Sequence, residues 1–208
     1  MTTTKRARSA RSRTPSRDVQ AALVDAAEAV LLRDGPAGVT VRAVAIEAGV
    51  APMGVYNRFG NKDGLVEALL MRGFEGLKRA VAAHGELDPL DRLQRSGVRY
   101  REFALANREQ YGLMFGEALT TEPSEEFRAC AGGAFDELVE HVSLGMAAGR
   151  LIPGEARDAA QQIWSAVHGA VALEMSGRMR VDDPEANYLE LLDLLVRGLS
   201  VPSDGPAG

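Results

Sequence analysis

The residues best suited to chemistry in this 208-residue chain lie on two short helices that the sequence predicts between residues 40 and 65. Thr40 is a favourable cap for the first of them. Gly49 ends this helix, because glycine takes the left-handed conformation of a turn without a steric penalty. The second helix begins with Pro52, since proline at a first helical position loses no hydrogen bond. Two short helices joined by a glycine turn are typical of a helix-turn-helix, which presents side chains to DNA.

The second of these helices has one buried side and one accessible side. Val55 and Phe59 fall on the buried side at helical spacing. The accessible side carries mostly uncharged residues: Pro52, Met53, Gly54, Tyr56, Asn57 and Arg58. The alternative is a helical hairpin that only packs, but the charge of the preceding residues favours the DNA interpretation.

A run of basic residues precedes the motif. The first 17 residues contain six basic residues and no acid: Lys5, Arg6, Arg8, Arg11, Arg13 and Arg17. Residues 1–14 are therefore predicted to form a disordered basic arm that contacts phosphates or the minor groove. A solvated tail is the alternative for such an arm when it stands alone.

The charge of the chain is unevenly distributed. The whole chain has a net charge of −5, yet residues 1–72 carry 11 basic and 7 acidic side chains. Residues 73–208 carry 13 basic and 22 acidic ones. Only the amino-terminal third is thus suited to phosphates, and the acidic remainder would be repelled by a duplex.

Helical periodicity extends through the rest of the chain. A first helix is expected from residue 15 or 16 to Arg33, where Asp34-Gly35-Pro36 ends it. Asn61 is expected to cap a fourth helix that extends toward His84. Further helices are expected at residues 88–106, from 107 through 115, and at 123–148, 155–176 and 183–199. The prediction is an all-α protein of about nine helices, with domains at residues 15–62 and 63–200 and a disordered tail at 201–208.

The last two predicted helices carry more apolar residues than one buried face can use. One face of each is expected to pack in its own subunit and the other against a second copy, because a two-fold dimer reads two half-sites. The interface is expected to use Ile163, Val167, Ala170, Val171, Leu191, Leu192, Leu195 and Leu199. Central helices buried in a monomer are the alternative.

Other classes of protein receive little support from the sequence. One cysteine, Cys130, excludes an internal disulfide and suits a cytoplasmic location. No apolar run is long enough for a membrane span. The three histidines lie far apart and no catalytic motif is present, so no catalytic residue, metal or cofactor is expected. A small helical enzyme and a nonspecific architectural DNA-binding protein remain the rival hypotheses.

Taken together, these residues resemble the TetR family of bacterial transcriptional regulators. The resemblance rests on Thr40-Val41-Arg42 through Gly49-Val50, and on residues 55–65, VYNRFGNKDGL. The family pattern there is an aliphatic residue, Tyr, two variable positions, an aromatic, and a Lys shortly before a Leu. Trp164 through His168-Gly169 resembles a subgroup with a Trp…His-Gly signature.

The resemblance implies a role for each residue of the motif that contacts DNA. Thr40, Tyr56 and Lys62 would contact phosphates. Arg42 would bind a guanine, and Asn57 would reach an adenine or a phosphate. Pro52, Met53 and Gly54 match positions that face the bases, although Gly54 departs from the small hydroxyl residue common there.

The resemblance also implies that the larger domain binds a small effector whose occupancy moves the fourth helix and the DNA-binding heads. The expected effector is apolar or aromatic. Its cavity is expected to be lined by Phe74, Tyr100, Phe103, Met114, Phe115, Trp164 and His168. The implied function is a homodimeric repressor that binds a palindromic DNA operator and that the effector releases, with transcriptional activation as the alternative.

Overall fold

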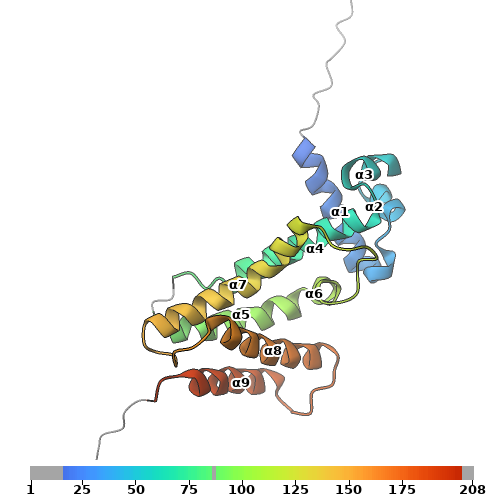
Figure 1. The fold of residues 1–208 in the computed structure, drawn as a ribbon. Helices are drawn as coiled ribbons and strands as arrows, with labels where there is room; N and C mark the ends of the chain where they lie inside the picture. Colours follow the sequence, from blue (N-terminus) through green and yellow to red (C-terminus); the bar gives the residue numbers. More distant parts are fainter. Residues whose placement is uncertain (1–15, 86–87, 203–208) are drawn as a thin grey trace, which may run out of the picture. The chain divides into compact units, whose positions relative to one another are not determined.

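The computed structural model describes residues 16–85 and 88–202, and every regular element in these ranges is an α-helix (Figure 1). The helices are α1 (Ser16–Gly38), α2 (Val41–Glu47), α3 (Pro52–Phe59), α4 (Lys62–Val81), α5 (Pro89–Ala106), α6 (Arg108–Met114), α7 (Glu125–Ala147), α8 (Ala156–Met175) and α9 (Pro184–Leu199). The predicted all-α class and the nine helices are confirmed for this part of the chain. The arm at 1–14 and most of the tail at 201–208 lie outside the described residues.

The chain divides into two compact units, with the division between Leu65 and Val66. The sequence placed the domain boundary slightly earlier, between residues 62 and 63. In the first unit α1 packs on α2, and α2 packs on α3. Their shared core includes side chains with no exposed surface: Ala27, Val30, Leu31, Val44, Ala45, Val55 and Leu65.

Helix α1 contains the break that the sequence predicted after Arg33. Gly35 has φ 71°, so the backbone leaves the helical path there, and Pro36 starts one further turn. Only glycine adopts this positive φ readily. The break brings the chain to Thr40, which begins α2.

The second unit begins at Val66, so it contains most of α4 together with α5 to α9, and its helices α5, α7, α8 and α9 pack against one another. Figure 1 shows α5, α7 and α8 side by side, with α9 along α8. Buried residues from each helix form its core, including Tyr100, Val142, Val171 and Tyr188. This packing reflects the helical spacing of apolar residues that the sequence shows.

Two helix ends in the second unit differ from the predicted ones. Helix α7 begins at Glu125 and not at Pro123, because the Ser124 hydroxyl accepts a hydrogen bond from the Phe127 amide at 3.1 Å and caps the helix. Phe115, which was expected inside the sixth helix, follows it as the capping residue. Both differences arise from capping geometry.

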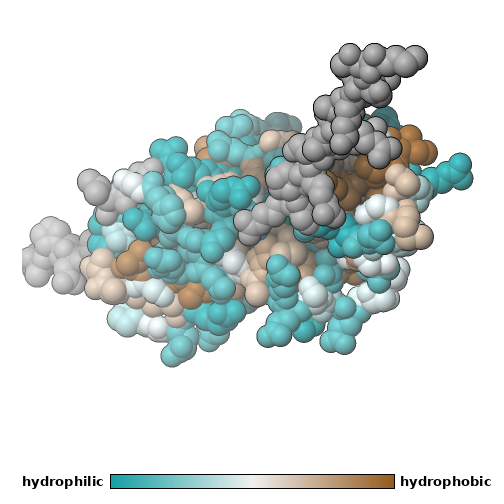
Figure 2. Space-filling model, turned by 90° about the horizontal axis from the view of Figure 1, so that it is seen from above, coloured by the Kyte–Doolittle hydropathy of each residue, from teal (hydrophilic) through white to brown (hydrophobic). Residues whose placement is uncertain are grey.

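Hydrophilic residues cover much of the face shown in Figure 2, with isolated hydrophobic residues among them. None of the described helices is both long enough and apolar enough to span a membrane.

Candidate nucleic-acid interface and ligand cavity

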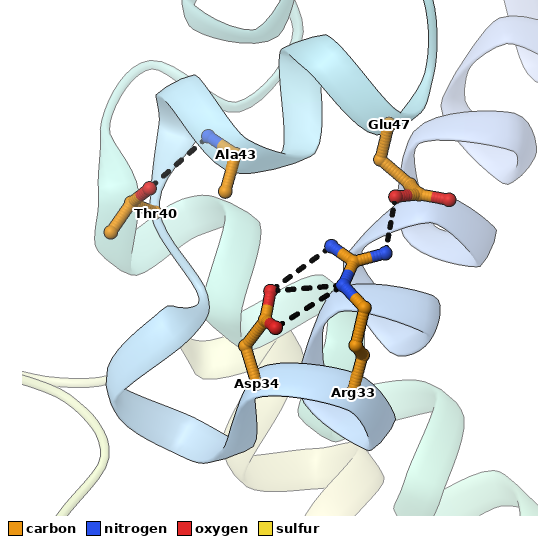
Figure 3. Close-up of polar contacts among 5 residues, drawn as sticks. All are labelled: Arg33, Asp34, Thr40, Ala43 and Glu47. Carbon is orange, nitrogen blue, oxygen red and sulfur yellow. Dashed lines mark hydrogen bonds and ion pairs between the residues drawn. The ribbon is translucent and has the colours of Figure 1, made fainter.

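An ion pair between Arg33 of α1 and Glu47 of α2 joins the first two helices of the DNA-binding unit (Figure 3). Arg33 Nη1 donates a hydrogen bond to Glu47 Oε2 at 2.7 Å, and Arg33 Nη2 donates to Asp34 Oδ2 at 3.0 Å. These two carboxylates raise the pKa of Arg33 further above its ordinary value. The arrangement neutralises Glu47, the one acidic residue between positions 40 and 62. The surface of α2 and α3 therefore carries no unpaired carboxylate to repel phosphates.

Helix α2 begins as the sequence predicted. Thr40 Oγ1 accepts a hydrogen bond from the Ala43 amide at 3.1 Å, which caps the helix (Figure 3). Gly49 has φ 66° and turns the chain toward α3. Thr40 and Arg42 are both exposed at the start of α2. The predicted cap and glycine turn are confirmed, while contacts of these side chains with DNA stay a prediction.

Helix α3 presents an accessible face that is almost free of charge. Its first residue is Pro52, and the capping residue Ala51 offers no side-chain hydrogen bond to the helix start. Val55 is fully buried, whereas 64% of Met53 and 47% of Tyr56 are exposed. The neighbouring Pro52, Gly54 and Asn57 are exposed as well. Arg58 and Phe59 are half-buried, so the expected burial of Phe59 and exposure of Arg58 are each only partly realised.

Lys62 follows α3 at the first position of α4 and is exposed. Asn61 Oδ1 accepts a hydrogen bond from the Gly64 amide at 2.8 Å, which confirms Asn61 as the cap of α4. A lysine at a helix amino terminus adds a cation where backbone N–H groups already favour an anion. Arg42 on α2 and Lys62 on α4 are thus exposed basic residues on the helices that precede and follow α3 in the chain.

The second unit contains a cavity of about 310 Å³. Residues of α4, α5, α7, α8 and α9 form its wall, together with Phe115. They are Phe74, Leu77, Val81, Leu93, Gln94, Ser96, Gly97, Tyr100, Phe115, Ala131, Gly132, Ala134, Phe135, Leu138, Ile163, Trp164, Val167, Leu192, Leu195 and Val196. A cavity of this size and composition suits a small, mainly apolar molecule.

Four of the seven residues expected at such a cavity line it: Phe74, Tyr100, Phe115 and Trp164. Phe103 and Met114 do not. Their side chains lie against glycines of α4. A Cβ added at Gly76 would be 3.1 Å from the Phe103 ring, and one added at Gly73 would be 2.7 Å from Met114 Sδ. They fill the space that these two glycines leave, which sequence spacing alone does not reveal.

His168 lies behind the cavity wall in a triangle of polar groups. Its Nδ1 is 3.0 Å from the hydroxyl of Tyr100 and 2.9 Å from that of Tyr111, and the two hydroxyls are 2.7 Å apart. Burial lowers the pKa of His168 and raises the pKa values of both tyrosines. All three groups are therefore neutral at neutral pH. Tyr111 was missed by the sequence analysis, which had no signal for a contact between residues 57 positions apart.

The residues expected at a dimer interface divide into two groups. Ile163, Val167, Val171 and Leu192 are buried in the chain itself, so their assignment to an intersubunit surface is corrected. Their helices pack on α5 and α7, and three of these residues line the cavity. Ala170, Leu191, Leu195 and Leu199 are half-buried. The exposed apolar residues of the same helices are Leu173, Leu189 and Leu194.

Two family descriptions match the chain. Residues 23–69 match the bacterial regulatory proteins of the tetR family, and residues 93–199 match the tetracyclin repressor-like C-terminal domain. An uncharacterized HTH-type transcriptional regulator of Mycobacterium tuberculosis, Rv0681, is 27% identical over 190 residues, which cover 89% of this chain and 83% of that relative.

Solved structures show the same fold. A protein with unknown function from Rhodococcus sp. RHA1 has a TM-score of 0.80 and 28% identity, with 88% of this chain and 96% of that chain covered. The TetR family transcriptional regulator PfmR from Thermus thermophilus has a TM-score of 0.64 and 20% identity, with 86% of this chain and 99% of that chain covered.

Proposed function

Because the chain belongs to the TetR family of bacterial transcriptional regulators, we propose that it represses transcription by binding a palindromic operator as a homodimer. A small apolar molecule in the cavity of the second unit would release it. In this proposal residues 15–62 bind DNA, and residues 63–200 bind the effector and form the dimer. The role is one of binding, with no catalytic step, and it belongs in the cytoplasm.

The accessible face of α3 is the observation that carries the DNA-binding role. Met53 and Tyr56 are largely exposed although both are sizeable apolar or aromatic side chains. An apolar side chain on this face suits the methyl group of thymine, and the Tyr56 hydroxyl suits a phosphate. Arg42 would supply a bidentate contact to guanine, and Asn57 would reach adenine or a phosphate.

The starts of α2 and α4 support the same role. Thr40 and Lys62 stand at the amino-terminal ends of α2 and α4, where phosphate oxygens are favoured. The basic residues of the first 17 positions would add phosphate contacts. We therefore expect an affinity for DNA that falls steeply with salt concentration.

The dimer is proposed on the exposed surface of α8 and α9. Leu173 and Leu194 are 47% and 60% exposed, so their apolar side chains are available for a contact with a second copy. Gly169 and Gly198 on the same helices have open space where a Cβ would stand. Small residues of this kind let a partner helix approach closely.

Helix α4 supports a coupling between effector and operator. It is one continuous helix from Lys62 to Val81, and its residues Phe74, Leu77 and Val81 form part of the cavity wall. A molecule that fits the cavity in one position of α4 better than in another would shift the equilibrium between them. Couplings of this kind are typically about 1–3 kcal/mol.

Binding to DNA selected by the protein itself tests the proposed function. A randomised duplex pool is passed over the full chain, and the enriched sequences are measured by fluorescence anisotropy. The proposal expects an inverted repeat, bound at least roughly a thousandfold more tightly than unrelated duplex. Enrichment of no sequence, with equal binding of all duplexes, would instead support a nonspecific architectural protein.

A further inference from the structure

The wall of the cavity, as far as the described residues form it, includes no carboxylate, amine, guanidinium or imidazole. Its polar side chains are Gln94, Ser96, Tyr100 and Trp164, and none of these is charged at neutral pH. One N–H of the Gln94 amide is occupied, because its Nε2 donates to Asp193 Oδ1 at 2.5 Å. The remaining lining residues are aliphatic, aromatic or glycine.

A charged ligand would find no counter-ion among these described wall residues. Transfer of an ion from water into an apolar site is unfavourable by several kcal/mol unless an opposite charge or several hydrogen bonds compensate it. Lys78 of α4 lies outside the wall, and its Nζ is 3.7 Å from Glu137 Oε1. The cavity is therefore selective for uncharged molecules.

One donor in the cavity wall, the indole N–H of Trp164, is only weakly used. When Nδ1 of the neutral His168 carries the lone pair, the hydroxyl protons of Tyr100 and Tyr111 are both consumed inside their triangle. Trp164 Nε1 lies 3.4 Å from the Tyr100 hydroxyl, which is long for a hydrogen bond. Because an indole is a donor only, this N–H can serve an acceptor atom in the cavity.

We propose that the cavity binds an uncharged, mainly apolar molecule with one hydrogen-bond-accepting oxygen, such as a ketone, ester or ether, and that Trp164 Nε1 donates to this oxygen. The inference rests on the proposed function, in which the cavity is the effector site. The uncharged wall favours a ligand without a formal charge. The Trp164 indole N–H favours a ligand with an oxygen that accepts a hydrogen bond.

The chain contains a single tryptophan, so the intrinsic fluorescence of Trp164 reports directly on occupancy. The full-length protein is titrated with 2-octanone, 2-decanone and 2-dodecanone, and with carboxylates and alkylammonium ions of the same chain lengths. We expect at least one ketone to change the fluorescence saturably and to bind more than tenfold more tightly than both charged analogues. Equal or tighter binding of a charged analogue would overturn the proposal, as would the absence of binding by all three ketones.

The hydrogen bond from Trp164 is tested by Trp164→Phe, with binding measured by calorimetry. Loss of one neutral hydrogen bond predicts roughly 3- to 10-fold weaker binding of the ketone. Tyr56→Phe is the control for ketone binding, because Tyr56 lies on α3 in the first unit and does not line the cavity. Unchanged ketone affinity in a folded Trp164→Phe protein would overturn the role of Trp164. Should that variant fail to fold, the comparison of ketone with carboxylate on the natural chain still decides the class of ligand.

Operator binding is measured on the same preparations, so that two failures can be told apart. A ketone that binds at Trp164 but leaves operator affinity unchanged supports the ligand class and contradicts the effector role. A protein that binds its operator but no ketone keeps the regulatory function and loses this inference.

Discussion

The hydroxyl of Tyr111 lies 2.9 Å from Nδ1 of His168, which joins α6 to α8 behind the cavity wall. Their rings are stacked at a centroid distance of 5.9 Å. The same imidazole nitrogen contacts Tyr100 of α5, so one histidine links three helices. The link is partly buried and uses a neutral imidazole, so protonation of His168 removes the lone pair that accepts from the tyrosines.

Stability should fall on acidification because of two histidines, the buried His141 and the half-buried His168. Burial lowers the pKa of His168 and that of His141 below the ordinary value of about 6.5. The unfolded chain then takes up protons at a higher pH than the folded one. The contribution to stability is complete above about pH 6.5 and is lost as the pH falls toward the lowered pKa values.

Thermal unfolding between about pH 7.5 and 5.0 measures this effect. The midpoint is expected to fall with pH, and less so in His168→Gln than in the natural chain. His84→Gln is the matched control, because His84 is exposed. An identical pH dependence in His168→Gln and the natural chain would contradict the assignment of a lowered pKa to His168.

Arg42→Ala should relax specificity at one base pair of each half-site. Loss of a bidentate contact to guanine predicts a cost of about 1–3 kcal/mol at the cognate base and little at the other bases. Affinities for operators substituted at each position, measured by anisotropy, test this. Equal weakening on every sequence would show that Arg42 contacts phosphate instead.

Lys62→Ala should weaken DNA binding equally on all sequences. Loss of one phosphate contact predicts that the slope of log affinity against log salt becomes smaller by about 0.9. Lys78→Ala is the matched control, because Lys78 is an exposed lysine of α4 that pairs with Glu137. If both variants leave the slope of log affinity against log salt unchanged, Lys62 does not contact a DNA phosphate.

Tyr56→Phe should reduce operator affinity while leaving the fold intact. The side chain is 47% exposed, and no contact of its hydroxyl stabilises the described part of the chain. We expect a loss of roughly 3- to 10-fold in affinity, the size of one hydrogen bond to phosphate, with an unchanged melting temperature. A lower melting temperature together with full affinity would place Tyr56 in the core instead.

Leu194→Glu should prevent dimer formation and operator binding together. A carboxylate in the middle of an apolar contact would be buried without a partner. Ile152→Glu is the matched control, because Ile152 is an apolar residue of similar exposure outside α8 and α9. Molar mass by light scattering gives the readout, and a Leu194→Glu protein that stays dimeric would move the interface elsewhere.

The helices were predictable because their signals are local. The caps Thr40 and Asn61, and the break at Gly35, act within a few residues of the chain and are all realised. Helical spacing likewise placed Val55 on the buried side of α3.

The cavity and the faces of α8 and α9 depended on contacts between distant residues. Spacing shows that Ile163 and Leu192 prefer burial, but it does not show whether their own subunit or a partner covers them. Helices α5 and α7 cover them, and this packing also creates the cavity. Phe103 and Met114 were misplaced for a related reason, because glycines of a different helix, Gly76 and Gly73, receive their side chains.

The most direct test is the salt dependence of binding by the full chain to an inverted repeat selected from random duplex, compared with a scrambled duplex of the same composition. Two α3 helices in two half-sites predict one dimer per duplex, a steep loss of affinity with salt, and a preference for the repeat of at least roughly a thousandfold. Equal affinity for both duplexes, or binding by a single chain, would contradict the account.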